Sequence, residues 1–330
     1  MTGKGTQITG KPADEARQLL IDLVDIPSVT GNEGNCAVRL AAFFEDHGRD
    51  VRIDEAGNVR APANDGVLLT SHIDTVPGEM LAAMAVAAVR TGASFLGVVG
   101  EEVDSRGSRH VVDTRESEPE TVVNGEPSGW EGITLGYRGL LGGTYVATSE
   151  SGHSSRPENN AIQDAMDWWN RVDAAFDRNE WEPVFERVTT KPVSFDGGIS
   201  DDGLSVEATM DVQLRVPPEY TADQVREIAD GCLENGTVTW YDRVEPTFQS
   251  PRTPVAAAFR AAIRKAGGQP RLLRKTGTSD MNIFAEHWNC PIVTYGPGDS
   301  GLDHTPNEHL PLPEYDRAIE VLETATERLL

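Results

Sequence analysis

The sequence lacks long hydrophobic runs and has few cysteines, and both absences narrow the possible classes of protein. No run of about 18 apolar residues occurs among the 330 residues, so we expect no membrane-spanning helix. The first twenty residues include acidic side chains and no apolar core, so we expect no signal peptide. The three cysteines are widely spaced and form no C-x-x-C pair, which argues against a disulfide scaffold or a cysteine zinc cluster and favours the cytoplasm.

Lysine is also scarce, and the net charge is strongly negative. Only five of the 29 basic residues are lysines, whereas 53 residues are acidic, which gives a formal net charge of −24 at pH 7. A nucleic-acid partner is disfavoured, because phosphate binding needs a basic surface. An excess of acid with so little lysine predicts a halophilic protein, soluble in high salt, where self-repulsion is screened. An ordinary acidic cytoplasmic enzyme is the alternative interpretation.

The order of hydrophobic patterns predicts an α/β domain that is interrupted by an α+β domain. Helical spacing and short apolar strands alternate from residue 13 onward, and the segments 111–113 and 120–124 continue that alternation. After residue 137 two expected helices lie among alternating strands, and the earlier rhythm returns near residue 253. We therefore expect a central, mostly parallel sheet in a catalytic α/β/α domain. The expected boundaries are 1–136 and 249–330 for the catalytic domain and 137–248 for the inserted domain.

A His-x-Asp triplet follows the strand that we expect at residues 67–73. His72 and Asp74 are two residues apart, so in an extended chain their side chains lie on one face. A metal-binding histidine needs its second ring nitrogen held, commonly by a carboxylate. The triplet is therefore a candidate metal site at a strand end, where α/β sheets bind their ligands. A capped strand end without a ligand is the alternative.

Two adjacent carboxylates, Glu101 and Glu102, directly follow the strand that we expect at residues 93–100. Neighbouring carboxylates repel each other, so such a pair persists most easily with a cation or a proton between them. One carboxylate can bind a metal ion while the other acts as a general base toward water. A solvated acidic turn is the alternative in so acidic a chain.

Two further strand ends supply Glu126 and His304, the latter in a glycine-rich loop after the strand expected at residues 292–295. Together with His72 and Glu102 they offer nitrogen and carboxylate ligands and no cysteine. Such a set suits Zn²⁺ or Co²⁺ in a catalytic rather than a structural site.

These four motifs, in this order and spacing, resemble the co-catalytic di-zinc deacylase and carboxypeptidase superfamily. That group includes acetylornithine deacetylase, succinyl-diaminopimelate desuccinylase and the aminoacylases. The resemblance covers nearly the whole chain, including residues 19–33 and 152–155. Within the superfamily, the short length and the segments 125–130, 132–139 and 274–282 are most similar to LysK-type hydrolases. Those enzymes release lysine or ornithine from the amino-group carrier protein LysW.

The resemblance implies two metal ions, Zn²⁺ or Co²⁺, and a ligand pair for each. His72 and Glu126 would bind one ion, and Glu102 and His304 would bind the other. It also implies that the inserted domain is a lid and dimerisation domain, so a homodimer is one possible assembly. LysW would be the partner that carries the substrate.

The resemblance further implies catalytic roles for three residues. Glu101 would be the general base and later the acid, and Asp74 would orient the histidine of its triplet. His153, on the inserted domain, would donate a hydrogen bond to the oxyanion of the tetrahedral intermediate. Arg215 and Arg274 are candidates for binding a substrate carboxylate, and a surface ion pair is the alternative for either.

The chain departs from the superfamily pattern after Glu79. The pattern has a fifth ligand, an aspartate that bridges the two metals in a Gly-Arg-Gly-x-x-Asp-x-x-Gly motif. Here Glu79 runs straight into the helix that should follow this motif, and no aspartate occurs between Asp74 and Asp104. Two cations without a bridging carboxylate would repel each other. We therefore expect at most one tightly held metal ion.

Three functions remain open on these grounds. The first is hydrolysis of LysW-linked lysine or ornithine. The second is deacylation of a small N-acyl amino acid of the acetylornithine type. The third is a non-catalytic relic that has lost activity with the bridging aspartate.

Overall fold

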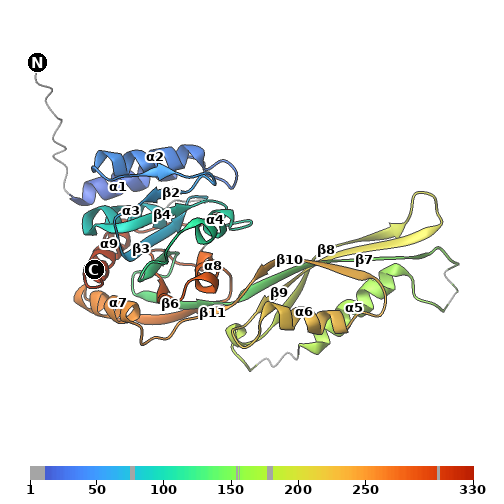
Figure 1. The fold of residues 1–330 in the computed structure, drawn as a ribbon. Coiled ribbons are helices and arrows are strands. Elements are labelled where there is room, and N and C mark those ends of the chain that lie inside the picture. The colour runs from blue at the N-terminus through green and yellow to red at the C-terminus, as the bar shows by residue number, and fades with distance from the viewer. Residues whose placement is uncertain (1–11, 75–78, 154, 156, 177–180, 303–304) are drawn as a thin grey trace, which may run out of the picture. The chain divides into compact units, whose positions relative to one another are not determined.

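The computed structural model describes the chain except for residues 1–11, 75–78, 154, 156, 177–180 and 303–304 (Figure 1). Its contacts divide the chain into two compact units. Unit 1 comprises Met1–Leu135, Gln249–Leu273 and Ile283–Leu330, and unit 2 comprises Gly136–Phe248 and Arg274–Asn282.

Unit 1 contains most of the helices and a sheet whose central four strands are parallel. The strand order is β1-β2-β4-β3-β5-β13-β6. Strands β4, β3, β5 and β13 pair in parallel, and the strands on either side of them pair antiparallel. The carboxyl ends of the four parallel strands therefore meet at one edge of the sheet, which is where such sheets bind ligands.

The helices of this part are α1 (Pro12–Val24), α2 (Gly34–Asp46), α3 (Glu79–Thr91), α4 (Arg106–Thr114), α7 (Pro254–Lys265), α8 (Asp280–His287) and α9 (Leu312–Glu327). The strands that lie wholly or partly in unit 1 are β1 (Arg52–Ile53), β2 (Val59–Ala61), β3 (Asn64–His72), β4 (Ala93–Val98), β5 (Val122–Gly125), β6 (Gly132–Tyr137), β12 (Arg271–Lys275) and β13 (Ile292–Thr294), whereas β11 (Thr247–Phe248) falls within unit 2.

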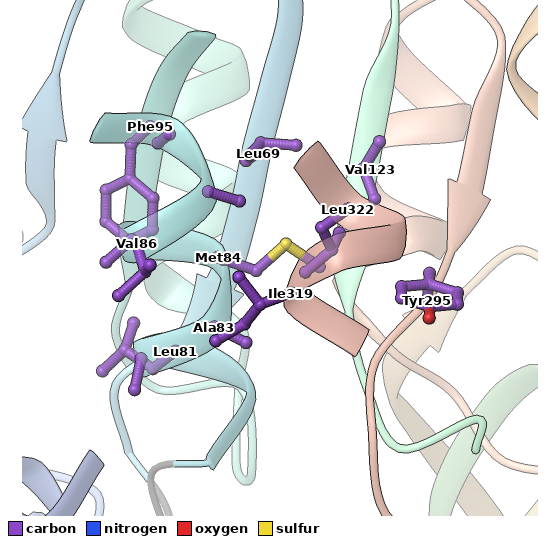
Figure 2. Close-up of a cluster of buried hydrophobic side chains, with 14 of the residues drawn as sticks. Leu69, Leu81, Ala83, Met84, Val86, Phe95, Val123, Tyr295, Ile319 and Leu322 are labelled. Atoms are coloured by element: carbon purple, nitrogen blue, oxygen red, sulfur yellow. The ribbon is translucent and has the colours of Figure 1, made fainter. Parts of the chain in front are cut away.

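Helix α3 is the centre of the core of unit 1. Residues 81–88 are each at most 1% exposed, as expected for a helix that is apolar on every side. Figure 2 shows Met84 of α3 beside Ile319 and Leu322 of α9, and α3 also packs on β3 and β4. Because β3 leads into α3 and α3 into β4, this βαβ unit is complete without the segment that the family resemblance leads one to expect after Glu79.

Unit 2 is built on a four-stranded antiparallel sheet with the order β10-β7-β9-β8. Helices α5 and α6 lie on one face of this sheet (Figure 1). Trp168 of α5 is fully buried and stacks on Tyr145 of β7, with 4.9 Å between the ring centroids. The elements of unit 2 are β7 (Gly139–Glu150), α5 (Ala161–Ala175), a 3₁₀ turn (Val184–Glu186), β8 (Thr189–Ile199), β9 (Ser205–Val216), α6 (Ala222–Gly231) and β10 (Thr237–Val244).

The predicted fold class is confirmed: a mixed α/β unit with parallel strands at its centre is interrupted by an antiparallel α+β unit. One segment was assigned wrongly. Residues 111–113, expected to continue the strand pattern, belong to α4, in which Gly107, Ser108 and Val111 are buried at helical spacing. None of the helices in the described part of the chain is long and apolar enough to cross a membrane.

Candidate metal centre and active site

Three of the predicted site motifs lie at the carboxyl ends of adjacent parallel strands. His72 is the last residue of β3, the pair Glu101 and Glu102 follows β4, and Glu126 follows β5. Strand β3 pairs with both β4 and β5. The sheet therefore brings these motifs together although they are separated by up to 54 residues of sequence.

His72, Glu101 and Glu102 form a group with the composition of a metal site. Each offers one ligand atom, and these atoms all lie within 4.8 Å of one another. The His72 Nε2 atom is also 3.8 Å from the Glu126 Oε1 atom, and both side chains are largely buried, at 13% and 15% exposure. An imidazole with carboxylates on two sides suits a divalent cation such as zinc. The described residues therefore fit one divalent cation.

The buried carboxylate of Asp74 organises this group through the backbone. Its side chain is fully buried. Its Oδ1 atom accepts the Glu101 N–H at 3.1 Å, and its Oδ2 atom accepts the Glu102 N–H at 3.2 Å and the Thr30 hydroxyl at 2.8 Å. Three donors offset the cost of burying this carboxylate.

The orientation of His72 is set by the backbone carbonyl of Asp74. The His72 Nδ1 atom hydrogen-bonds to that carbonyl oxygen, while the Asp74 Oδ1 atom is 3.9 Å away. A carbonyl oxygen only accepts, so the Nδ1 atom carries a proton, and in the neutral imidazole the lone pair is then on the Nε2 atom, on the Glu126 side. This is the tautomer that binds a metal through Nε2. The orienting contact that the sequence analysis ascribed to Asp74 thus comes from its main chain.

The fourth predicted metal ligand, His304, lies outside the described residues. The start of its loop is described and is tied to the loop that follows Glu126. The Gly129 N–H donates to the Gly298 carbonyl at 2.8 Å. The Glu314 Oε1 atom accepts the Gly298 N–H at 3.1 Å and the Trp130 N–H at 3.4 Å.

In unit 2, His153 and Arg274 are both accessible. The exposed His153 places its Nδ1 atom 2.8 Å from the Ser155 hydroxyl. Arg274 forms an ion pair with Glu186 at 2.5 Å, and its guanidinium lies over the Phe185 ring. The alternative that the sequence left open for Arg274, an ion pair, is what the structure contains.

Arg215 is less exposed, and a second arginine that the sequence analysis missed lies near it. Arg215 donates to the Thr278 hydroxyl at 3.3 Å, and burial lowers the pKa of its guanidinium. Arg138 is only 5% exposed, and its pKa is lowered to about 10 by burial, with further contributions from the positive charges of Arg215 and Arg187. Its hydrogen bonds go to three carbonyl oxygens and the Thr189 hydroxyl, all of them neutral. The position of Arg138 directly after β6 was the available sequence signal.

The chain is similar to known proteins over most of its length. Residues 79–328 match the peptidase family M20/M25/M40. A LysW-lysine hydrolase from Deinococcus radiodurans is 34% identical, with 96% of this chain and 98% of the relative covered. A putative LysW-lysine/LysW-ornithine hydrolase from Thermococcus kodakarensis is 33% identical, with 96% and 93% covered.

Solved structures confirm the fold. The M20 family metallo-carboxypeptidase Sso-CP2 from Sulfolobus solfataricus has a TM-score of 0.78 at 17% identity, with 96% of this chain and 99% of that chain covered. The aminopeptidase PepT from Bacillus cereus has a TM-score of 0.76 at 19% identity, with 96% and 98% covered.

The alignment lengths indicate that this chain lacks parts that its relatives have. The matches to the Deinococcus and Thermococcus relatives extend over 364 and 343 residues, more than the 330 residues of this chain. Parts of both relatives therefore have no counterpart here. The family match begins at Glu79, which leaves His72 and Asp74 outside it. On the extent of these matches, the chain belongs to peptidase family M20/M25/M40, a family of metal-dependent hydrolases of amide bonds.

Proposed function

We propose that this chain hydrolyses the amide bond that attaches lysine or ornithine to the carrier protein LysW, in lysine or arginine biosynthesis. The observation that carries the proposal is the 34% identity to a LysW-lysine hydrolase over almost the full length of both proteins. Relatives from Thermococcus and Pyrococcus, named for LysW-lysine and LysW-ornithine, support the same substrate class at 33% identity.

The metal-binding residues in this proposal are those that the strand ends supply. His72 and Glu126 would hold one divalent cation, Zn²⁺ or Co²⁺, and Glu102 and His304 are the ligands proposed for a second. The 3.8 Å separation of the His72 Nε2 and Glu126 Oε1 atoms supports the first pair. A cation held there would supply Lewis acidity, which polarises a carbonyl oxygen and lowers the pKa of water.

Glu101 is the proposed general base. It would take a proton from the attacking water and return it to the nitrogen of the departing lysine or ornithine, so that the carboxylate is regenerated in each turnover. The anchoring of its N–H on Asp74 supports this role, because it fixes the direction in which the Glu101 side chain leaves the backbone.

Two residues of unit 2 have proposed roles toward the substrate. His153 would donate a hydrogen bond to the developing oxyanion. Arg215 would bind a substrate carboxylate. The nearby Arg138 supports this, because the positive charges of Arg215 and Arg187 lower its pKa and a bound anion would offset that repulsion. Arg274 is the weaker candidate, because Glu186 already pairs with it.

The test uses the purified full-length chain, loaded with Zn²⁺ or Co²⁺, and two substrates: LysW carrying lysine, and N-acetylornithine. Free amino acid is measured over time, with the Glu101→Ala variant as the blank. Release from LysW well above that from acetylornithine supports the proposal. Preference for acetylornithine would establish the small-molecule deacylase instead. No release from either substrate, in a chain that retains metal, would identify a binding protein without turnover.

A further inference from the structure

The loop between α1 and α2, residues 25–33, contains a motif that the proposed mechanism does not use. Two of its polar side chains are nearly buried: Ser28 is 4% exposed and Glu33 is 5% exposed. Burying polar groups is costly unless they are hydrogen-bonded, so the partners of the polar side chains in this loop indicate their structural role. Both Thr30 and Glu33 of this loop contact the structure around the acidic segment 100–105.

Thr30 acts at the start of that segment. Its hydroxyl donates to the Asp74 Oδ2 atom at 2.8 Å, and the same oxygen accepts the Glu102 N–H at 3.2 Å. The other oxygen of Asp74 accepts the Glu101 N–H at 3.1 Å. A carboxylate that is held by a third donor cannot rotate freely, so Thr30 fixes the plane in which Asp74 receives the two amides.

Glu33 acts at the end of the segment. Its carboxylate pairs with the guanidinium of Arg106, the first residue of α4. The preceding residue, Ser105, has a φ angle of +51°, a conformation that costs energy for a residue other than glycine. Such a backbone persists only where its surroundings hold it, and the Glu33–Arg106 ion pair holds the adjoining residue.

Backbone hydrogen bonds also close the acidic segment into a turn. The Gly100 carbonyl accepts the N–H of Asp104 at 3.0 Å and of Ser105 at 2.6 Å. Gly100 itself has a φ angle of +78°, and a side chain there would overlap the Arg106 guanidinium. The segment is therefore a tight turn with one anchor at each end, and the Glu101 and Glu102 side chains project from between the anchors.

We propose that Thr30 and Glu33 are positioning residues for the metal centre: they clamp the two ends of the turn and so fix the directions of Glu101 and Glu102. The importance of those directions rests on the roles proposed for the two glutamates. The clamp itself is a property of the metal-free chain and can be measured without turnover.

The first measurement is hydrogen exchange of the metal-free, full-length protein, read in peptides that cover residues 99–106. Thr30→Val removes the hydroxyl at nearly constant shape, and Thr30→Ser retains it. We expect exchange of the Glu101 and Glu102 amides to become about five- to tenfold faster in Thr30→Val, the factor given by loss of one hydrogen bond, and to stay unchanged in Thr30→Ser. Thr326→Val is the control, because Thr326 is a buried threonine of unit 1 whose hydroxyl has no hydrogen-bond partner among the described residues.

Glu33→Gln is the matched test of the other anchor. Its control is Glu323→Gln, which breaks the 2.7 Å ion pair with Arg90 elsewhere in unit 1. We expect faster exchange in residues 103–106 for Glu33→Gln alone. Unchanged exchange of the segment in both Thr30→Val and Glu33→Gln would overturn the clamp, even if both variants melt at lower temperature.

The second measurement is binding of Co²⁺, by titration and by its visible absorption spectrum. Residues that orient metal ligands typically contribute 10- to 100-fold to metal affinity, so we expect Thr30→Val and Glu33→Gln to weaken Co²⁺ binding about tenfold and Thr30→Ser to restore it. Faster exchange without any change in Co²⁺ affinity would confine the clamp to the backbone and overturn its role at the metal centre. If the unmodified chain binds no Co²⁺, the proposed metal centre fails, and the clamp still stands or falls on the exchange data.

Discussion

The Oδ1 atom of Asp74 accepts the backbone N–H of Glu101 at 3.1 Å, although the two residues are 27 positions apart in the sequence. Asp74 follows strand β3 and Glu101 follows the neighbouring strand β4. This bond therefore joins the ends of two adjacent parallel strands at the edge where the metal-binding side chains gather. The role of Asp74 is thus wider than orientation of His72, since its carboxylate sets the position of the acidic pair.

Asp74→Asn is expected to destabilise the protein by about 1–3 kcal/mol. Both carboxylate oxygens accept N–H groups, and an amide has only one oxygen, so its NH₂ group would face a donor in a buried site. Urea unfolding monitored by circular dichroism measures the difference. Asp113→Asn, at an exposed position on α4, is the control and should change stability by less than about 0.5 kcal/mol. Equal stability of the two variants would show that the amides are satisfied in another way.

Much of the centre could be predicted because its residues follow strands with clear apolar patterns. Strands β3, β4 and β5 were each visible as buried runs, and parallel strands place their carboxyl ends together. The contacts of Thr30 and Glu33 could not be predicted, because nothing in a local pattern indicates a partner 44 or 73 residues away. Residues 111–113 were misassigned for a related reason: only one face of α4 is buried, so its short apolar stretch resembles a strand.

The burial of Arg138 could not be predicted from the sequence, for a different reason. Burial of an arginine depends on acceptors from distant segments, here the carbonyl groups of Val184, Arg187 and Thr276. The strand β10 was also missed, because its residues are mostly exposed and its apolar alternation is short, with only Val238 and Trp240 packed against the core.

Glu101→Ala is expected to reduce turnover about 10²- to 10⁴-fold while leaving bound metal nearly unchanged, because the proposed base is not a ligand. Glu102→Ala is the matched comparison and should lose metal. The structure places both carboxylates within 4.8 Å of the His72 ligand atom, so metal analysis of the two variants is what separates them. Loss of metal in Glu101→Ala with retention in Glu102→Ala would exchange the two roles.

The stability contributed by Asp54 is expected to depend on pH. Burial acts to raise the pKa of this carboxyl, but hydrogen bonds from Asn58 and Arg60 outweigh it and hold the pKa below its usual value. A lowered pKa in the folded state stabilises the protein at pH values above the unfolded pKa of about 3.9 and is lost as the pH falls below it. Asp54→Asn should therefore reduce the free energy of unfolding most at pH 7, with a difference that shrinks below about pH 4. The control is Asp46→Asn, at an exposed position.

Low salt is expected to destabilise the protein, which we propose to be halophilic from its composition. A net charge of −24 with only five lysines produces self-repulsion that added salt screens. Thermal melts from low to multimolar KCl should show a rising melting temperature. A melting temperature that does not depend on KCl would favour the ordinary acidic enzyme.

The missing segment after Glu79 leads to the final prediction, which concerns the number of metal ions. Strand β3 ends at His72 and α3 begins at Glu79, so the chain closes its βαβ unit without the segment, and the fold does not require it. The resemblance implies that the chain lacks a bridging carboxylate between two cations, which would otherwise repel each other. The chain as it stands should therefore retain at most one metal ion after dialysis.

Inserting a Gly-Arg-Gly-x-x-Asp-x-x-Gly segment after Glu79 should raise the metal content to two ions and increase release of lysine from LysW. The matched control is the same insertion with its aspartate replaced by alanine, which has the same length and cannot bridge. Elemental analysis after dialysis, together with turnover of both proteins, distinguishes added length from the added ligand. Two tightly bound ions in the unmodified chain would show that another carboxylate already bridges them, and Glu79→Gln would then be the first variant to examine, because Glu79 is the only acidic residue between Asp74 and Glu101.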